Sequence, residues 1–177
     1  MTITKFLSLL ILLDLSFCIG CKDKEWTTLP PETQTGARTF GCYVNGELFV
    51  KGKETLFHPL LIASYYKNNN SFSISCTSND NQSIGMQLNN VEVNISKPIS
   101  EAYFFSYGAN CYCFSEKEIG EIIITKFDTI SGHAFGIVSG QFQFKGQCSD
   151  NTLNITGDSI VYVTNGRFDT VLGVYDN

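Results

Sequence analysis

The sequence has little histidine and little positive charge. Among its 177 residues there are 2 histidines, His58 and His133, and 12 Lys and Arg stand against 17 Asp and Glu, which gives a net charge of −5. Proteins that bind nucleic acids or anionic surfaces usually present clustered Lys and Arg, and the sequence contains no run of such residues. The charge balance therefore argues against nucleic acid and against anionic lipid as partners.

The sequence also lacks the common catalytic motifs. No Gly-x-Ser-x-Gly elbow, His-Glu-x-x-His pair or Gly-rich phosphate loop occurs. His58 precedes a proline and His133 lies in a Gly-Ser loop, so neither is marked as a general base. We expect no enzymatic activity, no cofactor and no metal site. The remaining enzymatic alternative is an envelope glycoside hydrolase, which needs two carboxylates about 5–10 Å apart, drawn from Glu116, Glu118, Glu121 and Asp128.

The long hydrophobic run of the sequence lies at the N-terminus, in residues 6–19. A membrane-spanning helix needs about 20 apolar residues, and Asp14 would be costly near its centre. The run ends in Cys18-Ile19-Gly20-Cys21, which resembles the lipobox of bacterial lipoprotein precursors. We therefore expect residues 1–20 to be a lipoprotein signal peptide and Cys21 to be the acylated first residue of the mature chain. An ordinary secretory signal cut at the same bond is the alternative.

The residues after Cys21 indicate a location and a tether. An acidic residue directly after the acylated cysteine is typical of retention at the inner membrane, whereas Lys22 stands there in this chain. We expect a protein that is lipid-anchored in the bacterial outer membrane and faces either the periplasm or the exterior. The Pro, Thr and Gly content of residues 27–37 predicts a flexible spacer. Residues 21–37 are thus interpreted as a lipidated flexible tether, and residues 38–177 as a single domain.

Beyond the tether, short alternating apolar runs are separated by turn residues. Asn45-Gly46 joins residues 40–44 to 47–50, and this dipeptide is a strong signal for a two-residue hairpin turn. The hairpin places Cys42 opposite Phe49. No run has sustained helical periodicity, and residues 103–114 are interpreted as one aromatic-rich strand. We predict an all-β domain, an antiparallel β-sandwich or flattened barrel built from consecutive hairpins.

Five cysteines remain after the signal and the acylated residue are set aside. They can form two disulfides at most, and the sequence does not assign the connectivity. Cys111 and Cys113 lack the spacing of a metal or redox motif, and we interpret them as buried free thiols. The five are Cys42, Cys76, Cys111, Cys113 and Cys148.

Aromatic residues are concentrated in the middle of the domain. In a strand, one member of each adjacent aromatic pair faces outward, where a tyrosine ring can stack on a sugar or a partner protein. We therefore expect a non-catalytic binding module for a glycan or a partner protein, of unknown oligomeric state. The alternative is a barrel whose apolar lumen carries a small lipophilic ligand. The candidate binding residues are Tyr65, Tyr66, Tyr103, Tyr107 and Tyr112.

The order of several motifs resembles a family of small bacterial envelope lipoproteins of unknown function. Segments 29–36, 39–46, 122–128, 139–144 and 165–169 carry the resemblance, among them Thr33-Gln34-Thr35-Gly36 and Gly166-Arg167-Phe168-Asp169. Residues 51–115 match the family poorly. The resemblance implies a lipid-anchored all-β domain and supplies no activity.

Three tripeptides resemble the Asp-Ser/Thr-aliphatic signal for O-glycosylation that some bacteria use on exported proteins. The same tripeptides also form Asx turns that lead into strands. The candidate acceptors are Thr129, Ser159 and Thr170.

Overall fold

The computed structural model describes residues 26–55, 59–106, 111–115, 120–129, 134–150 and 159–176. Within these ranges no helix could span a bilayer. The fold is all-β, as predicted, and the described residues include one short 3₁₀ helix, η1, at Lys67–Asn69. The strands are β1 (Thr39–Val44), β2 (Glu47–Val50), β3 (Leu61–Tyr66), β4 (Ser71–Thr77), β5 (Gln82–Asn89), β6 (Ser96–Pro98), β7 (Glu101–Ser106), β8 (Cys111–Ser115), β9 (Gly120–Thr129), β10 (Phe135–Asp150) and β11 (Ser159–Tyr175).

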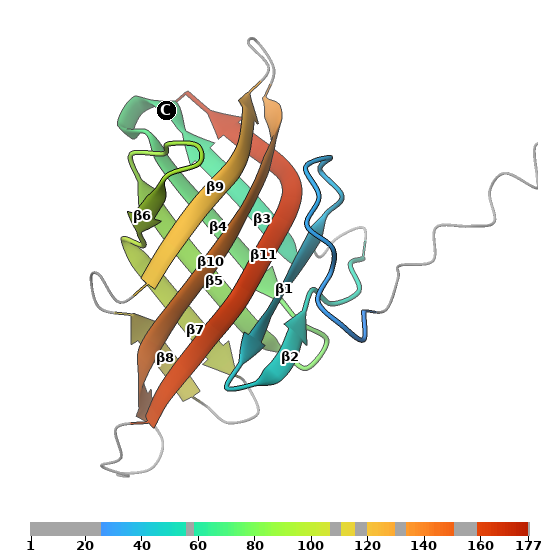
Figure 1. The fold of residues 1–177 in the computed structure, drawn as a ribbon, viewed down its shortest axis with the longest axis vertical. Helices are drawn as coiled ribbons and strands as arrows, with labels where there is room; N and C mark the ends of the chain where they lie inside the picture. The colour runs from blue at the N-terminus through green and yellow to red at the C-terminus, as the bar shows by residue number, and fades with distance from the viewer. Residues whose placement is uncertain are drawn as a thin grey trace, which may run out of the picture.

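The strand pairings run round a ring, so the sheet curls into a flattened barrel. The order β11-β3-β4-β5-β7-β8-β10 returns to its start because β10 also pairs with β11. In Figure 1 the long strands β10 and β11, with β9, lie in front of β3, β4, β5 and β7. The pairings are antiparallel apart from the one between β3 and β11, whose three residue pairs are parallel. The hairpin β1–β2 continues from the outer edge of β11, and β9 with β6 from the edge of β10.

The first hairpin forms as its turn sequence predicts. Asn45 and Gly46 both have positive φ, 50° and 87°, as a type I′ turn requires. Cys42 pairs with Phe49, which confirms the predicted register. Residues 103–114, expected as one strand, are instead divided between β7 and β8, which pair with each other.

Glycine and phenylalanine alternate across the pairing of β10 with β11. Gly140 pairs with Phe168 and Gly166 with Phe142. A Cβ added at Gly140 would lie 2.7 Å from the ring of Phe168, and one at Gly166 would lie 2.5 Å from the ring of Phe142. Each ring therefore covers the glycine of the neighbouring strand, and no larger residue fits beneath it.

Aromatic rings fill the centre of the barrel. The ring centroids of Phe40 and Phe142 are 5.1 Å apart, and those of Phe72 and Phe168 are 5.9 Å apart. Phe142 and Phe168 join the two pairs, at 6.3 Å. These four buried rings occupy space that a lipophilic ligand would need, and their packing favours a solid core over a carrier lumen.

A disulfide lies where β8 meets β10. Cys113 and Cys148 are paired residues of these strands and are bonded to each other, so the interpretation of Cys113 as a free thiol is wrong. Cys42 and Cys76 are free and buried. Burial raises the pKa of both thiols, which keeps them protonated and unreactive towards the disulfide. The side chain of Cys111 lies outside the described residues.

The disulfide should stabilise the domain, because it joins the strands that close the ring. Replacing Cys113 and Cys148 together by Ser should lower the free energy of unfolding by about 4 kcal/mol, given the 35-residue separation. Chemical denaturation with and without reductant measures this effect. Reductant should destabilise the wild type and leave the double variant unchanged; a wild type that does not respond to reductant would contradict the assignment.

Candidate functional site

Asp169 holds the segment before β1 against the outer surface of the barrel. It lies on β11 between the inward-facing Phe168 and Thr170, and its side chain is nonetheless 1% exposed because residues 33–37 cover it. Its Oδ2 accepts hydrogen bonds from Thr33 Oγ1 (2.6 Å), Thr35 N (2.9 Å), Ala37 N (3.1 Å) and Thr35 Oγ1 (3.4 Å), and its Oδ1 from Gly36 N (2.8 Å) and Ser139 Oγ (2.8 Å). We call residues 26–37 the strap, and this set of bonds the Asp169 clasp.

The clasp corrects the predicted extent of the tether. Residues 27–37 were expected to be flexible, whereas backbone N–H groups of the strap bind a buried carboxylate. Gly36 has a φ of +74°, which L side chains rarely adopt, and this turns successive N–H groups toward Asp169. Pro30 is buried over Gly41, where an added Cβ would lie 2.6 Å from its ring. The folded domain thus begins before residue 38, and Cys21 lies outside the described residues.

Hydrogen bonding keeps the Asp169 carboxylate ionised. Burial raises its pKa, but the bonds from Thr33, Thr35, Ala37 and Gly36 outweigh burial and lower the pKa to about 2. A carboxylate saturated in this way has no lone pair left for a substrate. The clasp is therefore a structural site.

The three candidate O-glycosylation residues differ in their exposure to solvent. Thr129 is partly exposed at the end of β9, and Ser159 begins β11, although its side chain lies outside the described residues. Thr170 is 1% exposed and faces the core, and its hydroxyl has no hydrogen-bond partner among the described residues. The prediction for Thr170 is corrected, since a glycan cannot reach this hydroxyl in the folded domain.

The tyrosine candidates do not form a single site. Tyr65 points inward, packs against Phe127 with centroids 4.8 Å apart and donates its hydroxyl to Asn70, so its assignment to a binding surface is wrong. Tyr66 faces outward and stacks on Tyr175 at 5.3 Å. Tyr107 and the side chain of Tyr112 lie outside the described residues.

Tyr103 lines a groove of about 550 Å³ on the outer surface of β3, β4, β5 and β7. These strands lie behind β10 and β11 in Figure 1, so the groove faces away from the viewer. Pairing places four outward residues in one row across the strands, in the order Ile62, Ser75, Gly85 and Tyr103. The neighbouring row contains Ser73, Gln87 and Glu101. Ile62, which is 49% exposed, forms the aliphatic wall of the groove, and Tyr103 forms the aromatic wall. Small residues form the floor between them.

Gly85 explains the position of the Tyr103 ring. A Cβ added at Gly85 would lie 2.2 Å from Cε1 of Tyr103 and 2.6 Å from its hydroxyl oxygen. The far end of the ring therefore rests on the backbone of β5, and the ring lies along the sheet as a partly exposed platform. Tyr103 was predicted from its outward position, whereas the small residues that flank it carry no sequence signal of binding.

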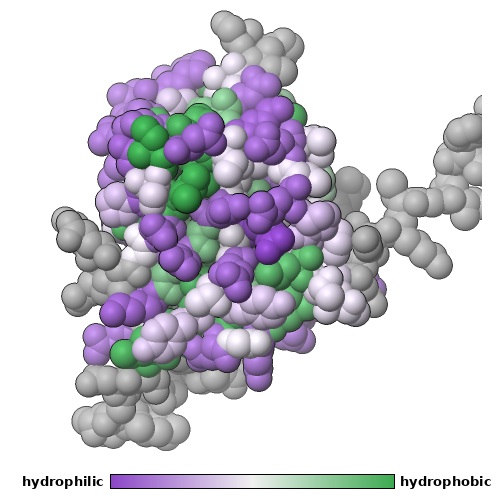
Figure 2. All heavy atoms as spheres, in the orientation of Figure 1, coloured by the Kyte–Doolittle hydropathy of each residue, from purple (hydrophilic) through white to green (hydrophobic). Residues whose placement is uncertain are grey.

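The opposite face of the barrel, shown in Figure 2, is mostly hydrophilic, with separate hydrophobic areas. Glu121 on this side accepts hydrogen bonds from Ser96 (2.6 Å) and Gln143 (2.7 Å), and these bonds lower its pKa. A glycosidase general acid needs a raised pKa. Glu116 and Glu118 lie outside the described residues, as do both histidines.

The described residues contain no group of three His, Cys, Asp or Glu side chains placed to hold a metal ion. Comparison with known proteins finds no family model, no curated protein and no solved structure that matches the chain. The function must therefore be argued from the geometry of the sites.

The clasp predicts acid sensitivity. The folded pKa of Asp169, about 2, lies below an ordinary value of about 3.9, so its contribution is present above pH 4 and lost as the pH falls through about 2. Asp169→Asn should lower the free energy of unfolding at neutral pH by about 2 kcal/mol and flatten its pH dependence in this window. Denaturant unfolding between pH 2 and 7 measures both effects. Asp128→Asn, at an exposed position of β9, should match the wild type; equal curves for all three proteins would contradict the clasp.

Proposed function

We propose that the protein is a lipid-anchored binding protein of the bacterial outer membrane whose β-domain binds a glycan without catalysis. The observation that carries the proposal is the partly exposed Tyr103 ring, whose far end rests on Gly85 beside a floor of serines. Ser73 and Ser75 offer hydroxyls, Gln87 offers an amide and Glu101 a carboxylate. A sugar ring has apolar C–H faces and hydroxyl edges, and such a platform with polar neighbours suits both.

The presence of one carboxylate in the groove favours binding over hydrolysis. Glu101 is the single carboxylate among the described residues that line it. Glycoside hydrolysis generally uses a pair of carboxylates. The groove therefore supports recognition of a glycan and not its cleavage.

A partner protein is the second candidate ligand. Phe135 and Tyr175 face outward at the end of the barrel where β10, β11 and β3 meet, and they are 65% and 43% exposed. Exposed aromatic side chains grouped on one surface are typical of protein contacts. A lipophilic ligand has less support, because the phenylalanines of the core fill the barrel.

The anchor is the part of the proposal that rests on sequence alone. Thr33, the first strap residue bound by Asp169, follows Cys21 by 12 residues. Those residues span about 40 Å when fully extended. A lipid on Cys21 would therefore keep the barrel close to the membrane surface, and the strap would fix where the chain leaves the barrel.

Tyr103→Ala tests the groove. A screen of purified bacterial and host glycans first identifies a ligand, and calorimetry then measures its dissociation constant. The alanine variant should bind about fivefold more weakly, because the ring face contributes about 1 kcal/mol, while Tyr103→Phe should bind nearly as the wild type does. Tyr162→Ala removes a ring that is 53% exposed outside the groove and serves as the matched control. A screen without any ligand, or equal binding by the alanine variant, would contradict the proposal.

Cys21→Ala tests the anchor. Each buried acyl CH₂ contributes about 0.8 kcal/mol to membrane binding, so the variant should leave the membrane fraction while its domain stays folded. Fractionation followed by intact-mass measurement checks this outcome. An unmodified wild-type mass would remove the anchor from the proposal and leave the groove untouched.

A further inference from the structure

Glu101 lies in the groove beside the Tyr103 ring. The two residues are two positions apart on β7 and both face outward, so a rise of about 3.3 Å per residue separates their Cα atoms by roughly 6.6 Å. Gln87 on β5 pairs with Glu101, and Ser73 on β4 pairs with Gln87. The Glu101 carboxylate is therefore close enough to contact a substituent of a sugar that lies against the tyrosine ring.

The groove carries negative charge. The described residues that line it include one carboxylate, from Glu101, and no Lys, Arg or His, which gives a charge of −1 at neutral pH. A uronic acid or a phosphorylated sugar would meet a like charge there and no compensating cation among these residues. The charge of the groove thus favours a ligand that is neutral or cationic.

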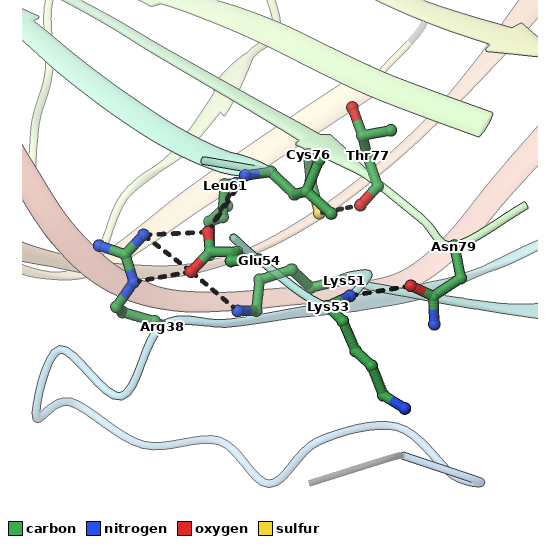
Figure 3. A network of polar contacts seen from close by, with 9 residues as sticks. Arg38, Lys51, Lys53, Glu54, Leu61, Cys76, Thr77 and Asn79 are labelled. Atoms are coloured by element: carbon green, nitrogen blue, oxygen red, sulfur yellow. Dashed lines mark hydrogen bonds and ion pairs between the residues drawn. The ribbon is translucent and has the colours of Figure 1, made fainter. Parts of the chain in front are cut away.

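The carboxylate of Glu101 is not used to hold the fold together. Glu54 accepts Arg38 and Lys51, as Figure 3 shows, and Asp169 accepts the donors of the strap. No ion pair or side-chain hydrogen bond among the described residues engages the Glu101 carboxylate, and the residue is exposed. A bound ammonium group would therefore gain this carboxylate without displacing another cation.

We infer that the groove selects a glycan that carries a free amino group, whose ammonium binds the carboxylate of Glu101. The inference rests on the proposed function, because it takes the groove as a glycan site and names the class of sugar. An ammonium forms a charge-assisted hydrogen bond with a carboxylate. The sugar face against Tyr103 and the ammonium at Glu101 fix the orientation of the ligand at two points.

Three linear tetrasaccharides with the same linkage test the inference. One is built from glucosamine, one from N-acetylglucosamine and one from glucuronic acid, so that they are cationic, neutral and anionic. Calorimetry at about pH 6, where amines are protonated, measures the dissociation constant of the mature protein for each. The glucosamine tetramer should bind about threefold more tightly than its N-acetylated form, as expected of one exposed ion pair, and the glucuronic acid tetramer should bind most weakly.

Glu101→Gln keeps the shape of the side chain and removes its charge. This variant should bind the N-acetylated tetramer as the wild type does and should lose the threefold preference for the glucosamine tetramer. Glu47→Gln, the same change at an exposed position of β2, should keep the preference. Tyr103→Ala should weaken the binding of both tetramers, and unfolding midpoints show that the variants are folded.

The outcomes separate the two proposals. Equal binding of the glucosamine and N-acetylglucosamine tetramers by the wild type, or a preference that survives in Glu101→Gln, overturns the amino-sugar class. Weaker binding by Tyr103→Ala in the same experiment still supports the glycan groove.

Failure of the wild type to bind either tetramer also overturns the amino-sugar class, and failure to bind any glycan of the wider screen overturns the proposed function with it. Tetralysine carries the same charge as the glucosamine tetramer and has no sugar ring. Equal binding of tetralysine would assign the groove to a basic peptide and overturn both.

Discussion

The buried carboxylate of Asp169 is the interaction on which the organisation of this domain depends. It joins the strap to β11 directly and to β10 through Ser139. A carboxylate taken out of water is tolerated when its oxygens are saturated with donors, and backbone N–H groups of the strap supply three of them. Without the strap the charge would be uncovered, and without the charge the strap would lose its attachment. The strap therefore stabilises the buried carboxylate, and the carboxylate holds the strap in place.

The clasp connects three separate motifs of the sequence. Thr33 to Gly36, Ser139-Gly140 and Phe168-Asp169 are far apart in sequence, yet they meet at the clasp and at the glycine–phenylalanine pairs beneath it. These motifs build the scaffold. The groove residues, from Ile62 to Tyr103, all lie in residues 51–115.

Local turn chemistry predicts the first hairpin and the all-β class. Long-range contacts determine the order of the strap, the burial of Thr170 and the pairing of β7 with β8. Asn45-Gly46 specifies its own turn, and alternation within each short run specifies an all-β fold. The strap could not be predicted, because the partner that orders it is more than 130 residues away. The sequence alone predicts Thr170 as a glycan acceptor at the start of a strand. Because Asp169 faces outward, alternation along β11 places the side chain of Thr170 in the core. The pairing of β7 with β8 was missed because both strands lie within one run rich in aromatics.

Only some of the residues that form these sites could be predicted from the sequence. The outward position of Tyr103 follows from alternation along β7, while the glycine and serines beside it come from two other strands. Glu54 likewise binds Arg38 and Lys51, which precede and follow the β1–β2 hairpin. Charge counted along a chain does not show such a cluster, because the counting ignores which residues the fold brings together.

Backbone hydrogen exchange at Thr35, Gly36 and Ala37 tests the central claim most directly. These amides lie outside any strand and donate to Asp169, so we predict that they exchange as slowly as the amides of β11 at neutral pH. Exchange at the rate of an unstructured peptide would contradict it, because the strap would then be a free tether and the carboxylate beneath it uncovered.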